Sequence, residues 1–139
     1  MTRAKLALVM TAAFAAPGSA ETLVDWQLLA IDGVVVDMPA TLRIGTDGSL
    51  SGQAPCNGWS AANGATLPDL ALGGIRATRM ACDRLADEDA FFAVLALMTR
   101  LEQDGDRALV LTGAEGRSME FVRDLTGAAD LCMTCAPQD

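Results

Sequence analysis

Turn-forming dipeptides recur along this chain and constrain its fold more than any other feature of the sequence. Asparagine or aspartate followed by glycine supplies the positive φ angles that tight turns between antiparallel strands require. Such pairs separate short apolar stretches at Asp32-Gly33, Asp47-Gly48, Asn63-Gly64 and Asp104-Gly105. Residues 41–44 alternate between polar and apolar side chains, which is the period of a strand with one buried face. We therefore expect mainly antiparallel β structure.

Two positions refine this expectation. Asn63-Gly64 is the strongest hairpin signal and predicts a tight turn between strands over residues 59–62 and 65–72. Gly52 lies inside a predicted strand, where a missing side chain marks a bulge, a bend or the close approach of another backbone. We therefore expect strong curvature in this part of the sheet.

One segment departs from the strand pattern and predicts a helix from Asp87 to Arg100. Asp87 would cap this helix, and Glu88 and Asp89 would act as first-turn charges beside its positive end. The apolar residues recur at spacings of three and four, at Phe91, Val94, Leu95, Met98 and Leu101. The fold class is therefore α+β, mainly antiparallel β: a small curled sheet or β-barrel-like domain with one packed helix.

The first twenty residues have the pattern of a signal peptide. Arg3 and Lys5 precede an apolar run over residues 6–16, and small residues follow at 17–20. The run is too short to span a bilayer, and no cysteine lies near the expected cleavage site to carry a lipid anchor. We expect residues 1–20 to be removed and the protein to be periplasmic or secreted, with no integral membrane segment.

The net charge of −8 argues against nucleic acid or an anionic membrane surface as a partner. Either partner would need a basic face from which counterions are released. Removing residues 1–20 would make the chain still more acidic, because that segment carries Arg3 and Lys5 but no acid. The remaining acids are scattered, so solubility is a sufficient explanation for them.

The four cysteines are expected to form two disulfides in an oxidising compartment. Spacing alone does not decide the pairing, and we favour Cys56 with Cys82 and Cys132 with Cys135. A zinc site would need a second close cysteine pair or histidines, and the chain has no histidine. We therefore expect neither a metal nor a cofactor.

Asn57, Trp59 and Arg79 are the candidate binding residues among the polar and aromatic side chains of the central stretch 48–82. An amide beside a bend commonly bonds to backbone groups, and a tryptophan most often supplies core area. The alternative is a surface or barrel-mouth patch that recognises a peptide or an envelope component. The chain has neither histidine nor tyrosine, which removes the commonest general bases and many proton donors, so we expect no catalytic residues and no enzyme.

Three segments, in this order, resemble the META domain, the family of heat-inducible HslJ-like bacterial envelope proteins. They are Gly-Ser-Leu-Ser-Gly at 48–52, Cys56-Asn57 and Thr-Arg-Met-Ala-Cys at 78–82. The resemblance implies a domain over residues 21–123 with a β-barrel-like fold and one helix, and it implies no established enzymatic activity. Residues 124–139 then form a C-terminal tail that carries the Cys-x-x-Cys sequence.

The resulting hypothesis is an exported, noncatalytic envelope-stress or binding module, as the association of the family with heat shock implies. Its partner would be an unknown envelope protein or a small ligand. One alternative is a secreted inhibitor of a basic enzyme such as lysozyme, which the acidic composition would suit. A second alternative is a thiol-disulfide exchange protein that uses Cys132 and Cys135, although this pair does not open a helix as redox pairs normally do.

Overall fold

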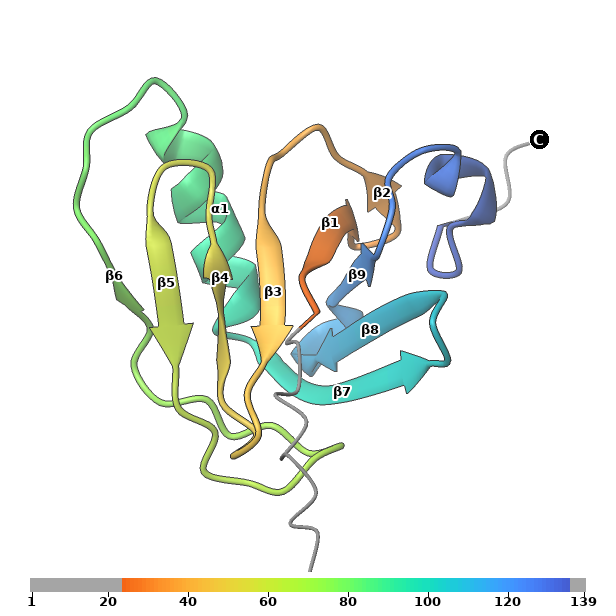
Figure 1. The fold of residues 1–139 in the computed structure, drawn as a ribbon, viewed down its shortest axis with the longest axis horizontal. Helices are drawn as coiled ribbons and strands as arrows, with labels where there is room; N and C mark the ends of the chain where they lie inside the picture. Colours follow the sequence, from red (N-terminus) through yellow and green to blue (C-terminus); the bar gives the residue numbers. More distant parts are fainter. Residues whose placement is uncertain (1–23, 136–139) are drawn as a thin grey trace, which may run out of the picture.

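The computed structural model describes residues 24–135, which form one curled antiparallel sheet and one α-helix (Figure 1). The strands are β1 (Trp26–Ile31), β2 (Val34–Val35), β3 (Thr41–Ile44), β4 (Leu50–Gln53), β5 (Gly58–Ala61), β6 (Arg76–Ala77), β7 (Met98–Asp104), β8 (Ala108–Gly113) and β9 (Ser118–Val122). The helices are α1 (Leu85–Leu95) and the short 3-10 turns η1 (Ala114–Gly116) and η2 (Ala128–Leu131). The expected signal peptide lies outside the described residues and stays a prediction.

The order of strands across the sheet is β6-β5-β4-β3-β1-β9-β8-β7, with β2 paired to β1 beside this path. The predicted α+β class and the curled sheet are confirmed. The sheet does not close into a barrel, because β6 and β7 remain its two ends. No helix within residues 24–135 is long and apolar enough to cross a membrane.

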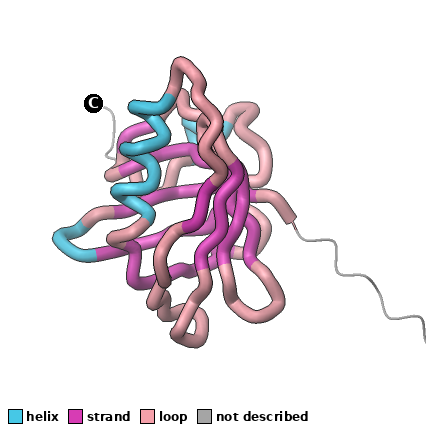
Figure 2. Tube along the Cα trace, turned by 90° about the vertical axis from the view of Figure 1, so that its left-hand side faces the viewer, coloured by secondary structure: helices cyan, strands magenta, loops and turns pink. Residues whose placement is uncertain are grey.

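The main core lies between α1 and the concave face of the sheet (Figure 2). Phe91 and Leu95 of α1 are fully buried, and the ring of Phe91 meets that of Trp59 edge to face, with centroids 5.9 Å apart. Burying each such side chain contributes about 1.5–3 kcal/mol. The helix therefore provides the large side chains that fill the concave face.

The helix is shorter than its apolar spacing predicts. It ends at Leu95, and Met98 and Leu101 are buried in the same core from β7. Pairing between residues 98–104 and β8 across the turn at Asp104 takes this stretch out of the helix. The start was also predicted wrongly, because the N-cap residue is Arg84, without a side-chain capping bond.

The turn predictions have mixed outcomes. Asp32 and Gly33 have φ angles of 51° and 75°, as the predicted tight turn between β1 and β2 requires. Gly52 confirms the predicted close approach, because a Cβ atom there would overlap the carbonyl oxygen of Thr41. The hairpin predicted at Asn63-Gly64 is wrong, because β5 pairs with β6 and residues 65–72 form no strand.

Asn63 instead organises a wide loop between β5 and β6. Its Oδ1 accepts hydrogen bonds from the N–H groups of Ala65 and Ala71, at 3.0 and 2.9 Å. The same loop runs along the edge of β7, where the Leu70 N–H bonds to the Thr99 carbonyl at 2.8 Å. The side chain of Asn63 therefore replaces a tight turn as the feature that shapes this loop.

The C-terminal tail covers the convex face of the sheet. Successive side chains of a strand point to opposite faces, so Met119 and Phe121 enter the main core while Glu120 and Val122 face outward. A second, smaller cluster forms on this outer face from Leu29, Ala30, Ala108, Val122 and Ala128, with Cys132 and Cys135 packed against it. The tail through residue 135 is therefore part of the packed structure.

Candidate functional site

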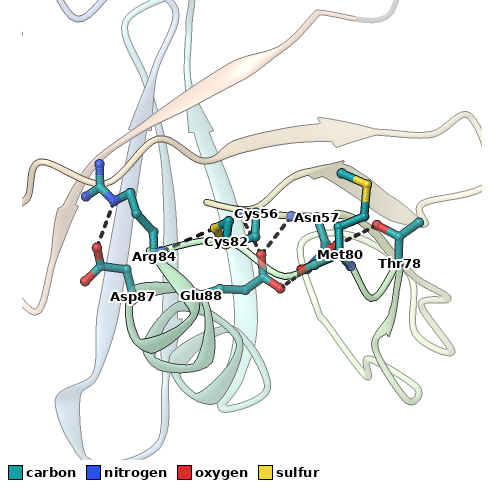
Figure 3. Close-up of a disulfide and its surroundings, with 8 residues drawn as sticks. All are labelled: Cys56, Asn57, Thr78, Met80, Cys82, Arg84, Asp87 and Glu88. Carbon is teal, nitrogen blue, oxygen red and sulfur yellow. Dashed lines mark hydrogen bonds and ion pairs between the residues drawn. A yellow bond between two sulfur atoms is a disulfide. The ribbon is translucent and has the colours of Figure 1, made fainter.

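A buried glutamate near the start of α1 lies under the loops that flank the first disulfide (Figure 3). Only 4% of the surface of Glu88 is exposed. Its Oε2 accepts the N–H groups of Cys56 and Asn57 at 2.7 and 2.8 Å, and its Oε1 accepts Nδ2 of Asn57 at 2.7 Å. The carboxylate is therefore surrounded by three nitrogen donors and has no cationic partner among the described residues.

These donors decide the charge of Glu88. Burial raises the pKa of the carboxyl, but the bonds from Asn57 and from the two backbone N–H groups outweigh it and lower the pKa below the usual value of a glutamate. The carboxylate is therefore negatively charged near neutral pH, and its oxygens are used within the protein.

Asn57 extends the network to the next loop. Its Oδ1 accepts the Met80 N–H at 2.6 Å and the Thr78 hydroxyl at 3.0 Å. Its Nδ2 also donates to the Met80 carbonyl, at 3.2 Å. The amide thus bonds to the loop before α1 and to α1 itself at the same time, and it is 2% exposed.

The first disulfide joins the same two loops. It links Cys56 to Cys82, with the Cα atoms 5.9 Å apart, as the favoured pairing has it. The covalent bridge and the Asn57 network therefore act in parallel on the segments 55–58 and 78–82. Glu88 holds the segment 55–58 against the N-terminal end of α1, and Asn57 bonds the segment 78–82 to it.

The three residues considered for binding do not form one surface patch. Asn57 and Trp59 are both buried, whereas Arg79 is exposed between Thr78 and Met80. Among the described residues the indole Nε1 of Trp59 has no hydrogen-bond partner, although its ring packs in the main core. Only Arg79, of these three, has a side chain that could meet a partner at the surface.

Sequence reasoning missed the central role of Glu88. We expected a first-turn charge, because acids near a helix N-terminus usually favour the helix dipole. A signal was present, since Glu88 lies three and seven residues before Phe91 and Leu95, on the same helical face as these buried residues. A carboxylate on an apolar face requires donors, and the loop amides provide them.

A second buried glutamate holds the C-terminal disulfide loop. Glu120 on β9 has no exposed surface, and its Oε1 accepts the Met133 N–H at 2.9 Å. Its Oε2 accepts both the N–H and the hydroxyl of Thr134, at 2.9 and 2.8 Å. The loop is closed by the disulfide between Cys132 and Cys135, which is the second favoured pair.

The contact between this disulfide and the carboxylate is also chemically informative. Sγ of Cys132 lies 3.3 Å from Oε2 of Glu120. Because Cys132 is bonded to Cys135, its sulfur carries no hydrogen to donate, so the contact is not a hydrogen bond in the oxidised protein. Within residues 24–135, no group of three or more His, Cys, Asp or Glu side chains is arranged to hold a metal ion.

Comparison with known proteins supports the architecture. The family model described as the META domain matches residues 20–126. A solved NMR structure of a protein from Burkholderia xenovorans has a similar fold, with a TM-score of 0.55 and 19% identity, over 89% of this chain and 99% of that chain. No curated protein matches the sequence. The loops around Glu88 lie inside the matched region, and the loop from Cys132 to Cys135 lies beyond it.

Proposed function

Because the chain belongs to the META domain family, we propose that it is an exported, noncatalytic module that acts in the bacterial envelope, in stress or in partner binding. The observation that carries this proposal is the use of the buried carboxylates. Glu88 and Glu120 are the buried acids among the described residues, and backbone donors occupy both of them. These carboxylates therefore stabilise the fold, and we expect the function to depend on residues at the surface.

The two disulfides support an oxidising location. Cys56–Cys82 and Cys132–Cys135 account for all four cysteines, and no free cysteine remains. Such bridges persist in secreted and periplasmic proteins and are rare where thiols are kept reduced. Together with the signal-like pattern over residues 1–20, this supports export.

The surroundings of Cys132 argue against thiol-disulfide exchange as the activity. An exchange protein needs a reactive thiolate, which cationic groups or a helix N-terminus favour. Cys132 instead lies beside the carboxylate of Glu120, and this negative charge would disfavour a second negative charge on the sulfur. Cys132 and Cys135 are therefore better suited to closing their loop than to cycling between the dithiol and the disulfide.

A complementation experiment tests the proposal. In a bacterial host that lacks its own copy, we expect the full chain to restore survival under heat or envelope-directed antibiotics. The matched control is the same chain without residues 2–20, which should accumulate inside the cell and fail to restore survival. Equal rescue by both chains, or no rescue by the full chain, would contradict a role in the envelope.

A further inference from the structure

The loop from Cys132 to Cys135 is held on the sheet by a buried carboxylate as well as closed by its disulfide. Glu120 accepts the N–H groups of Met133 and Thr134 and the Thr134 hydroxyl, and none of its surface is exposed. These three bonds do not involve the sulfur atoms. The loop should therefore keep its place against β9 when a reductant opens the disulfide.

The two sulfur atoms of the pair have different surroundings. Sγ of Cys132 lies 3.3 Å from Oε2 of Glu120 and 3.8 Å from the Thr134 hydroxyl oxygen. Within residues 24–135, Glu120 makes a sulfur contact with Cys132 but none with Cys135. The Cys135 end of the loop instead packs against Gly33, in the turn between β1 and β2. The negative charge of Glu120 therefore acts mainly on Cys132.

The other charged groups around this loop do not offset the carboxylate. Residues 124–135 carry two acids, Asp124 and Asp130, and no lysine or arginine. Cys132 follows the C-terminal end of η2, so no helix N-terminus favours a thiolate there. The arginines that line the hollow beside Met133, and the one beside the β1–β2 turn, are each paired with an acid: Arg107 with Asp104, Arg123 with Asp106, and Arg117 with Asp32.

We propose that Cys135 is a modification site, which forms a lasting mixed disulfide with a low-molecular-weight disulfide once a dithiol reductant has opened the pair. The reductant gives two electrons and two protons to the pair and leaves as its own disulfide. The Cys135 thiolate then attacks one sulfur of the small disulfide, and the other half leaves as a thiolate that takes up a proton. This inference goes beyond the proposed function, because it requires neither a stress role nor a partner protein.

Glu120 explains why the mixed disulfide would last. In a Cys-x-x-Cys pair, the second thiolate can attack the mixed disulfide, restore the protein disulfide and expel the small thiol. Here that thiolate would have to form on Cys132, beside the negative charge of Glu120. The reduced Cys132 can instead donate its S–H to Oε2 of Glu120 and remain a thiol. Cys135 therefore stays modified.

Two single-cysteine variants test the order of reactivity while the first disulfide stays intact. Cys132→Ser leaves Cys135 as a free thiol, and Cys135→Ser leaves Cys132 as one. With iodoacetamide near neutral pH, we expect Cys135 to react at least about tenfold faster. The rate of Cys132 should also reach half its maximum at least about one pH unit higher than that of Cys135. Mass spectrometry measures both rates, and coincident pH profiles or a faster Cys132 would overturn the proposal.

Glu120→Gln separates the charge from the burial of the thiol. It removes the negative charge at nearly constant size, so Cys132 in the Cys135→Ser chain should react at least about tenfold faster. Thr134→Val loosens the loop but keeps the charge, and it should change that rate by less than about threefold. An unchanged rate in folded Glu120→Gln would overturn the role of Glu120. If Glu120→Gln does not fold, the pH profiles of the two single-cysteine chains decide.

The mixed disulfide itself is tested in the chain with all four cysteines. The folded protein is reduced with dithiothreitol, freed of the reductant and exposed to oxidised glutathione, and the C-terminal peptide is sequenced by mass spectrometry. We expect glutathione on Cys135 and a free thiol on Cys132. Glutathione on Cys132, immediate closure of the pair without a mixed disulfide, or a pair that dithiothreitol leaves closed would overturn the proposal.

Discussion

Glu88 and Glu120 meet the same electrostatic requirement in two different parts of the molecule. Each is a buried carboxylate that accepts two successive backbone N–H groups and one side-chain donor, and each lies beside a disulfide. Glu88 connects α1 to loops far away in the sequence, inside the region that the family model matches. Glu120 fastens only the four-residue loop from Cys132 to Cys135.

The difference shows that the structural importance of a buried carboxylate depends on which segments its hydrogen bonds connect. If Glu88 lost its bonds, the amides of Cys56 and Asn57 would be left without an acceptor against the helix that fills the core. If Glu120 lost its bonds, a terminal loop would lift from the convex face and water could reach the freed groups. The two carboxylates accept the same kinds of donor, but we expect Glu88 to contribute more to the free energy of unfolding than Glu120.

Removing either carboxylate is expected to have the largest effect on the free energy of unfolding. Glu88→Ala should lower the free energy of unfolding by about 3–5 kcal/mol, because three donors are left buried without an acceptor. Glu120→Ala should cost about 2 kcal/mol, since its loop can turn toward water. Urea unfolding of both variants measures the difference. Equal losses would show that the C-terminal loop is as integral to the core as α1.

Removing each disulfide tests the same comparison through the unfolded chain. The bridge between Cys56 and Cys82 spans 26 residues and should contribute about 3.5 kcal/mol, whereas the bridge spanning 3 residues should contribute about 2 kcal/mol. Paired Cys-to-Ala variants at each bridge, compared by thermal unfolding, measure the two contributions. The comparison fails if the loss of the short bridge lowers the Tm more.

The side chains that donate to the two glutamates are expected to give a smaller difference in the free energy of unfolding. Asn57→Ala should cost about 2–3 kcal/mol, because the amide serves Glu88, Thr78 and Met80 at once. Thr134→Val removes a single hydroxyl bond to Glu120 and should cost about 1 kcal/mol. Denaturant unfolding provides the values, and Arg79→Ala, an exposed change, serves as the control with a change below about 0.5 kcal/mol. A larger loss for Thr134→Val would reverse the ranking.

The pH dependence of folding stability tests the contribution of Glu88 separately. The pKa of Glu88 in the folded protein is below the usual value of a glutamate, so its stabilising contribution is present above that usual value and is lost as the pH falls through the folded value. As the pH falls below the usual pKa of a glutamate, stability of the parent protein should therefore decline more steeply than that of Glu88→Gln. Chemical unfolding measured across the acid range tests this expectation. Parallel curves would mean that the carboxyl has no lowered pKa.

Much of the fold could be predicted from local chemistry. Asp32-Gly33 requires positive φ angles, and Gly52 requires a neighbour that excludes a side chain, so each indicates its structure directly. Met98 and Leu101 were placed in the wrong element, because their spacing fits a helix and their pairing with β8 is decided by distant residues. Asn63 failed as a turn signal because its side chain found backbone partners farther along the loop.

The candidate site was less predictable than the fold. The burial of Glu88 depends on amides from a loop 31 and 32 residues away, which no local pattern reveals. Glu120 occupies an outward position of an alternating strand, where an acid is normally solvated. Its burial follows from the tail that returns over that face. Contacts between segments far apart in the sequence, rather than residue type, therefore decide the roles of Glu88 and Glu120.

The pairing of residues 68–70 with β7 also bears on how copies of this protein coexist at high concentration. An uncovered edge strand is a template on which a second copy can dock its own edge and begin aggregation. Here a loop of the same chain occupies the first part of β7, and the charged pair Asp69 and Arg100 lies on it, 3.5 Å apart. Deleting that loop would therefore expose a longer edge and lower solubility before it affected the core.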